Sequence, residues 1–157
     1  MYAARLKPLN YPWPPVVYVL AITLAVLMGH IASLPALHSR GYVVWLAGGT
    51  LVVLAAAIDI WAVRTLWAGH TTAMPHRCAN RLVTGGPYRY SRNPIYLGYT
   101  LITLALGLLS GNIWFFAAAP AAAIVTSLYA ISREEKHLHA RFGADFERYC
   151  QRTRRWL

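Results

Sequence analysis

The chain has 157 residues, of which 57% are hydrophobic and only 13% are charged, about half of the ~25% charged fraction that soluble domains carry. Fifteen Lys and Arg residues outnumber five Asp and Glu residues, for a formal net charge of +10. The basic residues flank long apolar runs and no basic-aromatic nucleic-acid motif accompanies them, so the composition argues against a soluble or nucleic-acid-binding protein and predicts one membrane-embedded domain over residues 1–157.

Two long apolar runs come first. Residues 16–37 and 42–63 each reach the ~20 residues that a helix needs to cross a bilayer, so residues 1–65 are expected to hold two spans. Gly48 and Gly49 predict close helix packing in the second span. Asp59 also lies there, and two interpretations stay open for it: it contributes to a ligand cavity, or it pairs with Arg64 or another basic residue near the interface.

A polar connection follows from residue 66 to residue 93, and it leads into the most informative stretch, residues 82–98, Leu-Val-Thr-Gly-Gly-Pro-Tyr-Arg-Tyr-Ser-Arg-Asn-Pro-Ile-Tyr-Leu-Gly. The Gly-Gly-Pro triplet predicts a turn, and Asn93-Pro94 predicts the start of a helix. Bulky polar and aromatic side chains on a bent chain at the membrane edge indicate a binding site.

A helical hairpin is predicted next, with arms at residues 95–109 and 113–131. The first arm is short for a span, so we expect it to begin at Pro94 and to lie partly inside the protein. Pro120 predicts a kink in the second arm.

The chain becomes charged from Ser132 but keeps an apolar stripe with helical spacing, formed by Leu138, Phe142, Phe146 and Tyr149. We expect Gly143 to divide this segment into two short helices, and the segment to lie on the bilayer or under the bundle. Residues 152–157, Arg-Thr-Arg-Arg-Trp-Leu, are interpreted as an interfacial anchor.

The distribution of basic residues predicts the topology. Two Lys and Arg residues precede the first span, four lie in the 66–93 connection and seven follow the last span, whereas the two opposite connections hold only Arg40. The positive-inside rule then places both termini in the cytoplasm. The predicted fold class is an all-α, polytopic membrane helix bundle with about four transmembrane helices and a cytoplasmic C-terminal amphipathic segment, in the cytoplasmic membrane of a prokaryote. Cys78 and Cys150 are interpreted as reduced, unremarkable thiols.

Two polar clusters, one within residues 82–98 and the other Arg133-Glu134-Glu135 after the last apolar run, suit a zwitterionic ligand that contains a nucleoside. No serine elbow, phosphate-binding loop or metal-ligand cluster occurs in the sequence. Glu134 and Glu135 could accept hydroxyl groups of a ribose or pair with an ammonium group, Arg92 could pair with a carboxylate, and tyrosine faces favour a sulfonium cation. S-adenosylmethionine has all four features. The alternative is that the glutamates only offset nearby arginines and that Arg92 reaches a lipid phosphate.

Residues 82–98, the hairpin, and then Glu134-Glu135-x-x-Leu138 with Phe142-Gly143 and Tyr149 resemble the isoprenylcysteine carboxyl methyltransferase family of integral membrane methyltransferases, to which phospholipid N-methyltransferases are related. The resemblance covers residues 82–157, nearly half of the chain. It implies S-adenosylmethionine bound from the cytoplasm and a lipophilic substrate that enters from the bilayer. Arg92 and Asn93 are the implied catalytic residues, and the implied cofactor-binding residues are Val83, Tyr88, Arg92, Asn93, Pro94, Tyr96, Glu134 and Glu135.

Asn93 departs from this family, which often has histidine at that position, and an amide cannot act as a base. Asn80 also departs from the family, because eukaryotic members tend to have histidine at that position. The chain is also shorter than the eukaryotic enzymes, which weakens the case for a prenylated protein as substrate.

The hypothesis is therefore methyl transfer from S-adenosylmethionine to a carboxylate, thiol, amine or phenol on a lipophilic acceptor. Tyr88 and Tyr96 would line the transfer channel, and no residue would act as a covalent nucleophile. The alternatives are an NADPH-dependent membrane reductase of the sterol-reductase type and a non-enzymatic, lipid-interacting membrane protein. The acceptor atom, the need for a general base and the oligomeric state stay open.

Overall fold

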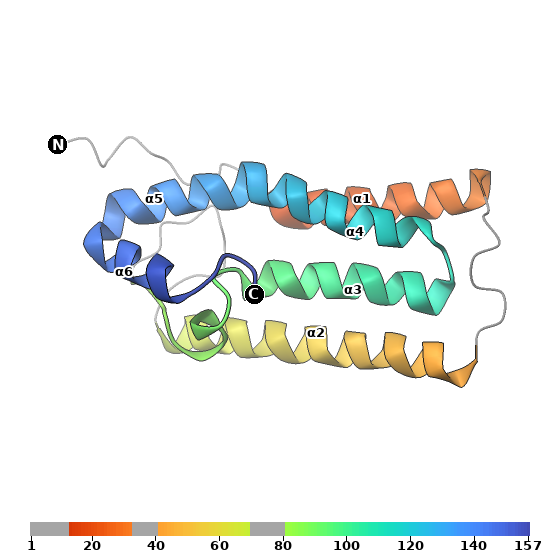
Figure 1. Cartoon of the computed structure of the whole chain (residues 1–157), viewed down its shortest axis with the longest axis horizontal. Helices are drawn as coiled ribbons and strands as arrows, with labels where there is room; N and C mark the ends of the chain where they lie inside the picture. Colours follow the sequence, from red (N-terminus) through yellow and green to blue (C-terminus); the bar gives the residue numbers. More distant parts are fainter. Residues whose placement is uncertain (1–12, 33–40, 70–80) are drawn as a thin grey trace.

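The computed structural model describes residues 13–32, 41–69 and 81–157 (Figure 1). Cys78 and Asn80 lie outside the described residues. The helices in chain order are α1 (Trp13–Ile31), α2 (Tyr42–Ala68), the 3-10 helix η2 (Gly86–Arg89), α3 (Pro94–Ser110), α4 (Trp114–Val125), the π-helical segment η3 (Thr126–Ile131), α5 (Ser132–Phe142) and α6 (Ala144–Arg152).

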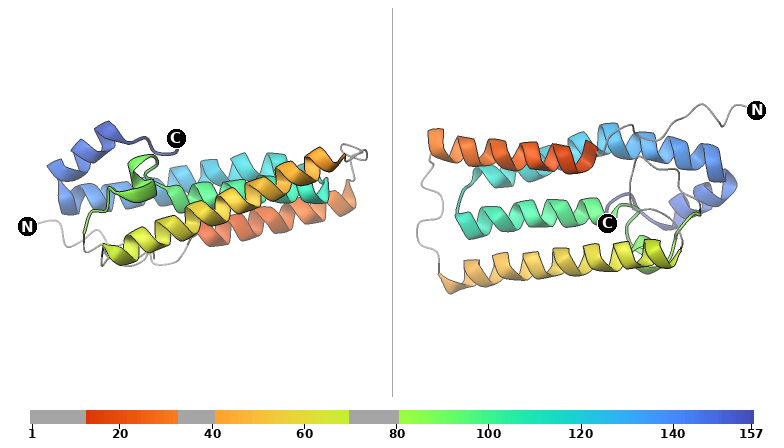
Figure 2. Two further views of the ribbon diagram at one scale, coloured as in Figure 1. Left: turned by 90° about the horizontal axis from the view of Figure 1, so that it is seen from below. Right: turned by 180° about the vertical axis from the view of Figure 1, so that it is seen from behind.

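Helices α1 to α4 run side by side along the long axis of the molecule (Figures 1 and 2). Helix α3 packs against α2 on one side and α4 on the other, and α1 packs against α4. Apolar side chains point outward from this layer, among them Leu20 at 63% exposure and Val53 at 67%. An apolar outer surface is what lipid tails require, so the predicted all-α membrane bundle is confirmed.

Among the described residues, three helical stretches are long and apolar enough to cross a membrane: Trp13–Ile31, Tyr42–Ala68 and Trp114–Phe142. Helix α3 has 17 residues and falls short of that criterion, so the expected count of four spans is corrected to three candidate spans and one shorter apolar helix. At 1.5 Å per residue, α3 measures roughly 25 Å against a hydrocarbon core of ~30 Å. Its buried positions Tyr96, Thr103 and Ala105 fit the expectation that it lies partly inside the protein.

Small residues allow the helices to approach closely. A Cβ atom at Gly48 would lie 2.8 Å from the side chain of Leu109, and one at Gly107 would lie 2.9 Å from the Cβ atom of Phe115. A Cβ atom at Gly49 would meet nothing within 4 Å. Of the predicted glycine pair, only Gly48 is therefore a packing position.

Asp59 packs against the backbone of α3. A Cβ atom at Gly98 would lie 2.0 Å from its Oδ1 atom, and this oxygen is buried without a hydrogen-bond partner among the described residues. Arg64 is exposed, and no ion pair joins it to Asp59. Of the interpretations left open for Asp59, the pair with Arg64 is therefore wrong.

The last span continues without a break into the charged segment. Helices α4, η3 and α5 form one helix of 29 residues, Trp114–Phe142, and α5 projects beyond the end of the bundle (Figure 1). At the π-helical turn, the Ser132 hydroxyl donates to the Ser127 carbonyl oxygen at 2.8 Å, five residues back. The expected separate helix from Ser132 is thus an extension of the span. Pro120 lies inside α4, six residues before this irregular turn.

Gly143 ends the long helix. Its φ of 52° and ψ of −124° lie in a region that residues with a side chain rarely adopt. Helix α6 then folds back toward the bundle (Figure 1). The predicted division into two helices at Gly143 is confirmed.

Candidate functional site

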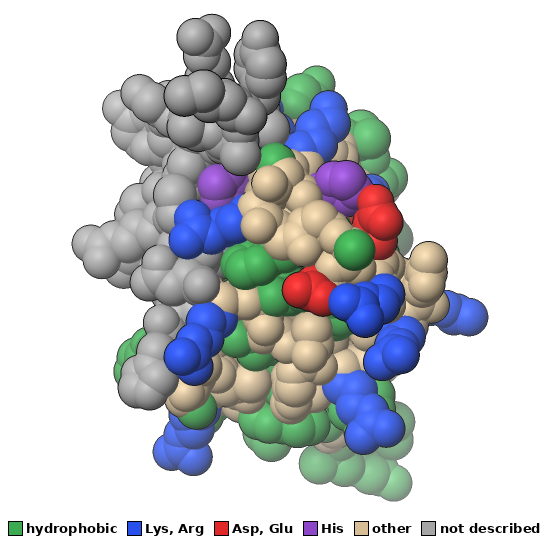
Figure 3. Space-filling view, turned by 90° about the vertical axis from the view of Figure 1, so that its left-hand side faces the viewer, with side chains coloured by type: hydrophobic (Ala, Val, Ile, Leu, Met, Phe, Trp, Pro, Cys, Tyr) green, Lys and Arg blue, Asp and Glu red, His purple; other side chains and the backbone are tan. Residues whose placement is uncertain are grey.

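The two polar clusters meet at the end of the bundle from which α5 projects. Between them lies a cavity of about 30 Å³, lined by Arg92, Asn93, Ile131, Glu134, Glu135, Leu138, Phe146 and Tyr149. Figure 3 views this end of the molecule, where Lys and Arg side chains gather and acidic side chains lie next to them. Three residues of the predicted apolar stripe, Leu138, Phe146 and Tyr149, thus form the apolar part of the cavity wall together with Ile131.

The turn before α3 brings Arg92 and Asn93 to this cavity. Gly86 has a φ of 59°, and a Cβ atom there would lie 2.5 Å from the Thr65 Oγ1 atom of α2, so both the backbone and the available space favour glycine. Pro94 is the first residue of α3, a position at which its missing N–H group costs nothing. The turn therefore packs on α2 and places Arg92 and Asn93 at the start of α3.

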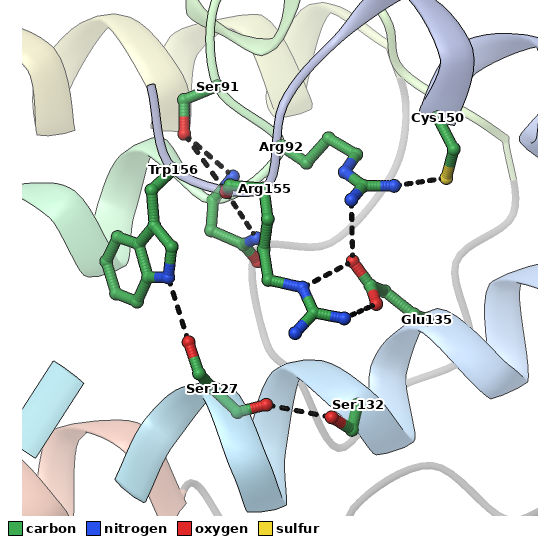
Figure 4. Close-up of polar contacts among 9 residues, drawn as sticks. Ser91, Arg92, Ser127, Ser132, Glu135, Cys150, Arg155 and Trp156 are labelled. Atoms are coloured by element: carbon green, nitrogen blue, oxygen red, sulfur yellow. Dashed lines mark hydrogen bonds and ion pairs between the residues drawn. The ribbon is translucent and has the colours of Figure 1, made fainter. Parts of the chain in front are cut away.

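Glu135 is held by two guanidinium groups (Figure 4). Its Oε1 atom lies 3.2 Å from Arg92 Nη2 and accepts a hydrogen bond from Arg155 Nε at 3.1 Å. Arg155 Nη2 donates to the other carboxylate oxygen, which makes the Arg155–Glu135 contact bidentate. The side chain of Glu135 is only 19% exposed and that of Arg92 16%, so solvent screens this pair less than a surface pair.

Arg92 also connects α6 to the site, because its Nη1 atom donates to the Sγ atom of Cys150. Its Nε atom is buried and has no hydrogen-bond partner among the described residues. One N–H group of a partly buried guanidinium is therefore available for a further acceptor.

Glu134 has a different environment from its neighbour. Its Oε2 atom accepts a hydrogen bond from the Tyr96 hydroxyl at 3.2 Å, and among the described residues no arginine pairs with it. Tyr96 is 8% exposed, and its ring lies 6.4 Å from that of Tyr99. Glu134 thus keeps free lone pairs on a carboxylate that faces the cavity.

Two tyrosines join the turn to α6. The Tyr149 hydroxyl donates to the Tyr88 carbonyl oxygen at 2.7 Å. Burial, and then the negative charge of Glu134, raise the pKa of the Tyr88 phenol, and burial raises the pKa of the Tyr149 phenol. Both phenols therefore keep their protons at physiological pH, and Tyr149 stays a hydrogen-bond donor.

The predicted site residues fall into three groups. Arg92, Asn93, Glu134 and Glu135 line the cavity. Tyr96 contacts Glu134, and Tyr88 contacts Tyr149 through its carbonyl group. Val83 packs 2.8 Å from the position of a Cβ atom at Gly69, at the end of α2, and Pro94 is buried at the start of α3; neither residue lines the cavity.

The segment Thr153–Trp156, which we call the strap, is the part of the site that sequence reasoning missed. Arg154 forms a parallel β-bridge with Ser91, and the Trp156 indole donates to Ser127 Oγ at 2.8 Å. Residues 153–156 thus pack on the turn and on the long helix, and the interfacial anchor expected for residues 152–157 stays a prediction. The signal in the sequence is charge balance, because two adjacent glutamates lie among seven basic residues in the last part of the chain.

The family model of phospholipid methyltransferases matches residues 43–145. The chain is 30% identical over 116 residues, 74% of its length, to the nickel-cobalt-cadmium resistance protein NccN of Alcaligenes xylosoxydans xylosoxydans, and it spans about half of that protein, 53%. It is 38% identical over 63 residues, 40% of its length, to an uncharacterized protein of Haemophilus influenzae, whose whole length is covered.

No solved structure gives a significant match. The family match runs from the start of α2 into α6, and it includes the turn before α3 and both glutamates. The chain therefore belongs to the phospholipid methyltransferase family, a family of membrane methyltransferases.

Proposed function

We propose that the protein transfers a methyl group from S-adenosylmethionine to a lipophilic acceptor at the cytoplasmic face of the membrane, as isoprenylcysteine carboxyl methyltransferases do. The observation that carries this proposal is that Arg92, Glu134 and Glu135 face one cavity, within the stretch that matches a methyltransferase family. The excess of basic residues at this end of the chain supports the cytoplasmic placement.

The polar groups of the site fit this cofactor. Glu134 retains lone pairs for ribose hydroxyls or for an ammonium group, and the unpartnered Nε atom of Arg92 can donate to a carboxylate. The rings of Phe146 and Tyr149 in the cavity wall offer faces on which a sulfonium cation is stabilised. These four residues are therefore the ones that we propose hold it.

When bound, S-adenosylmethionine supplies a methyl group that its sulfonium charge has already activated. The protein then has to align the acceptor with this methyl group and to keep water away. Ile131, Leu138 and Phe146 give the cavity apolar walls that exclude water. No side chain has to form a covalent bond.

Asn93 acts as a hydrogen-bonding residue in this proposal. Its Nδ2 atom donates to the Arg155 carbonyl oxygen at 2.9 Å, and its backbone N–H group donates to Ser91 Oγ at 3.1 Å. An amide cannot accept the proton that a thiol, amine or phenol releases on methylation. Asn93 therefore orients the turn next to Arg92.

The acceptor is proposed to be a lipid or another lipophilic molecule with a carboxylate, thiol, amine or phenol. The outer faces of α1 and α2 are apolar, so an acceptor dissolved in the bilayer can reach the bundle from the side. The family match also favours methyl transfer over the alternative of an NADPH-dependent reductase.

Calorimetric titration of the detergent-purified protein with S-adenosylhomocysteine, with NADPH as a parallel ligand, tests the proposal. We expect saturable binding of S-adenosylhomocysteine and a loss of about tenfold or more in Glu134→Gln and Arg92→Ala, since each removes about 1.4 kcal/mol or more of binding free energy. Arg154→Gln is the control, because its side chain is exposed.

Binding of NADPH alone would assign the protein to the reductases, and binding of neither ligand would leave a lipid-interacting role. Unchanged binding in both variants would refute the proposed roles of Glu134 and Arg92. Equal losses in Arg154→Gln would mean that net charge, and not the site, determines the affinity.

A further inference from the structure

One carboxylate of the chain has no polar partner in the part that the structure describes. The chain has five carboxylate side chains, and four of them have partners: Glu134 with Tyr96, Glu135 with Arg92 and with Arg155 of the strap, Asp145 with Arg148, and Glu147 with His139. Asp59 is the fifth, and among the described residues it accepts no hydrogen bond and forms no ion pair. An acidic residue within an apolar helix is costly, and it is typical of a functional position.

Asp59 lies between the backbone of α3 and the outside of the bundle. On one side, a Cβ atom at Gly98 would lie 2.0 Å from its Oδ1 atom, so glycine at this position is what lets the carboxylate reach α3. On the other side, Asp59 is partly exposed and the next residue, Ile60, is 55% exposed. Helix α2 forms one edge of the helix layer (Figure 1). A molecule dissolved in the bilayer can therefore reach this carboxylate from the side.

The Asp59 carboxylate lies deeper in the bundle than the polar cavity but close to it. Asn93 lines the cavity, and Gly98 follows it by five residues along the chain. At 1.5 Å per residue, the two positions are roughly 7–8 Å apart along the axis of α3. A ligand that fills the cavity and extends along α3 therefore comes next to Asp59.

The phenol of Tyr88 lies between the cavity and Asp59. Burial raises its pKa, and the negative charges of Glu134 and Asp59 raise it further. A charge has this effect only on a group nearby, so the phenol is close both to a carboxylate of the cavity and to Asp59. This agrees with the packing of the turn on α2, where a Cβ atom at Gly86 would lie 2.5 Å from Thr65 Oγ1.

We propose that Asp59 binds the group of the lipophilic acceptor that becomes methylated and takes up its proton, so that the acceptor is an amine, thiol or phenol and not a carboxylate. This inference rests on the proposed function. An ionised carboxyl group accepts a hydrogen bond from an N–H, S–H or O–H group, whereas it repels a second carboxylate, and most strongly in surroundings of low dielectric constant. Asp59 thus selects the acceptor by its chemistry.

Asp59 also supplies the base that the turn lacks, because the amide of Asn93 cannot accept a proton. When the acceptor atom forms its new bond to the methyl carbon, its proton passes to an oxygen of Asp59. The electron pair of the broken carbon–sulfur bond stays on sulfur. The positive charge of the sulfonium and the negative charge of the carboxylate disappear together, which is favourable in an apolar environment.

NMR of the aspartate carboxyl carbons tests where the acceptor binds. Asp59 and Asp145 are the two aspartates of the chain, so isotope labelling of aspartate gives two signals, and Asp145→Asn assigns them. With S-adenosylhomocysteine present, we expect dodecylphenol and dodecylamine to shift the Asp59 signal in detergent micelles, and dodecanoate to leave it in place. The Asp145 signal is the internal control, because this side chain is 68% exposed and pairs with Arg148.

Asp59→Asn tests what the carboxylate does. The amide has the shape of the carboxyl group beside Gly98 but cannot take up a proton. Calorimetric binding of dodecylphenol should weaken about tenfold or more, whereas binding of S-adenosylhomocysteine should stay at the wild-type value. With S-adenosylmethionine, the kcat for methylation of dodecylphenol should fall about a hundredfold or more. Asp145→Asn removes the same charge from the surface and should behave like the wild type in all three measurements.

Several results would overturn the proposal. They are an Asp59 signal that neither dodecylphenol nor dodecylamine shifts, a larger shift with dodecanoate, equal binding of dodecylphenol to wild type and Asp59→Asn, and an absence of methyl transfer to probes that bind. The NMR measurement uses the wild-type side chain, so it does not depend on the folding of a variant.

The two proposals fail in different ways. Probe binding that depends on Asp59, in a protein that does not bind S-adenosylhomocysteine, would support the acceptor site and refute the proposed cofactor. Binding of S-adenosylhomocysteine without any response of the Asp59 signal to the probes would support the cofactor and refute the role of Asp59.

Discussion

Asp59 and Gly98 form a contact that depends on the absence of a side chain. Because a Cβ atom at Gly98 would lie 2.0 Å from Asp59 Oδ1, Gly98→Ala forces the Asp59 side chain or the backbone of α2 to shift. We expect this variant to lose about 1–3 kcal/mol of unfolding free energy, measured as a lower midpoint of thermal unfolding in detergent. In the double variant Asp59→Ala and Gly98→Ala, the obstructing carboxylate is gone, so most of the loss should be recovered.

Gly49→Ala is the matched control for this cycle, since it adds a methyl group to α2 where nothing lies within 4 Å. It should leave the midpoint unchanged or raise it slightly. Additive losses in the double variant would contradict the proposed contact. They would mean that Asp59 stabilises the bundle through some other interaction.

The junction between α5 and α6 needs a backbone conformation that residues with a side chain rarely adopt. Gly143 has a φ of 52° and a ψ of −124°, and a Cβ atom there would meet nothing within 4 Å, so the cost of Gly143→Ala is a backbone cost alone. We expect Gly143→Ala to lower the free energy of unfolding by about 1–3 kcal/mol. Weaker binding of S-adenosylhomocysteine should accompany it, because α6 carries Tyr149 into the cavity wall.

Gly85→Ala serves as the control for Gly143→Ala. Gly85 has a φ of −96° and also has nothing within 4 Å of its Cβ position, so alanine is tolerated there. Thermal unfolding and ligand titration of both variants give the comparison. Equal stability of the Gly143→Ala and wild-type proteins would contradict a strained junction.

The stability of the whole molecule should fall in alkaline solution. Burial raises the pKa values of Tyr88 and Tyr149 in the folded protein above the value of about 10 that phenols have in an unfolded chain. Above that pH the unfolded chain releases protons that the folded protein retains, so rising pH favours unfolding. The stability from these phenols is complete below about pH 10 and decreases above it.

Tyr149→Phe identifies the contribution of one phenol. The variant lacks the hydrogen bond to Tyr88, so its free energy of unfolding at neutral pH should be about 1 kcal/mol lower than that of the wild type. Above about pH 10 its stability should then decrease less steeply than that of the wild type. Urea unfolding in mild detergent at a series of pH values measures both effects. A parallel pH dependence in variant and wild type would show that Tyr149 ionises normally.

Apolar run length and turn chemistry predicted the helices well. The starts of α2 and α3 and the break at Gly143 follow from residue types that act locally, namely apolar runs, Pro94 at a first helical position and glycine. The end of α4 was not predictable in this way. The charged residues after Ser132 indicated the start of a separate helix. A change from apolar to charged side chains does not end a helix, however, as long as its backbone hydrogen bonds continue.

The site was predicted only in part, because its partners are far apart in sequence. The motif residues Arg92 and Glu135 meet as expected, but Arg155 lies 20 residues beyond Glu135 and on the other side of a helix reversal at Gly143. Charge alone could not select it from seven basic residues in that part of the chain. The single domain and the cytoplasmic placement of both termini stay predictions.

The continuity of the helix Trp114–Phe142 has a consequence for the lipid environment. One end of this rod lies among apolar helices, and the other end carries Glu134 and Glu135, whereas Arg92 belongs to the turn that packs on α2. A bilayer that is thicker or thinner than the apolar length of a helix changes the tilt of that helix. Tilting this rod would move the carboxylates relative to Arg92, so we expect the separation of the charges in the site to depend on the thickness of the surrounding membrane.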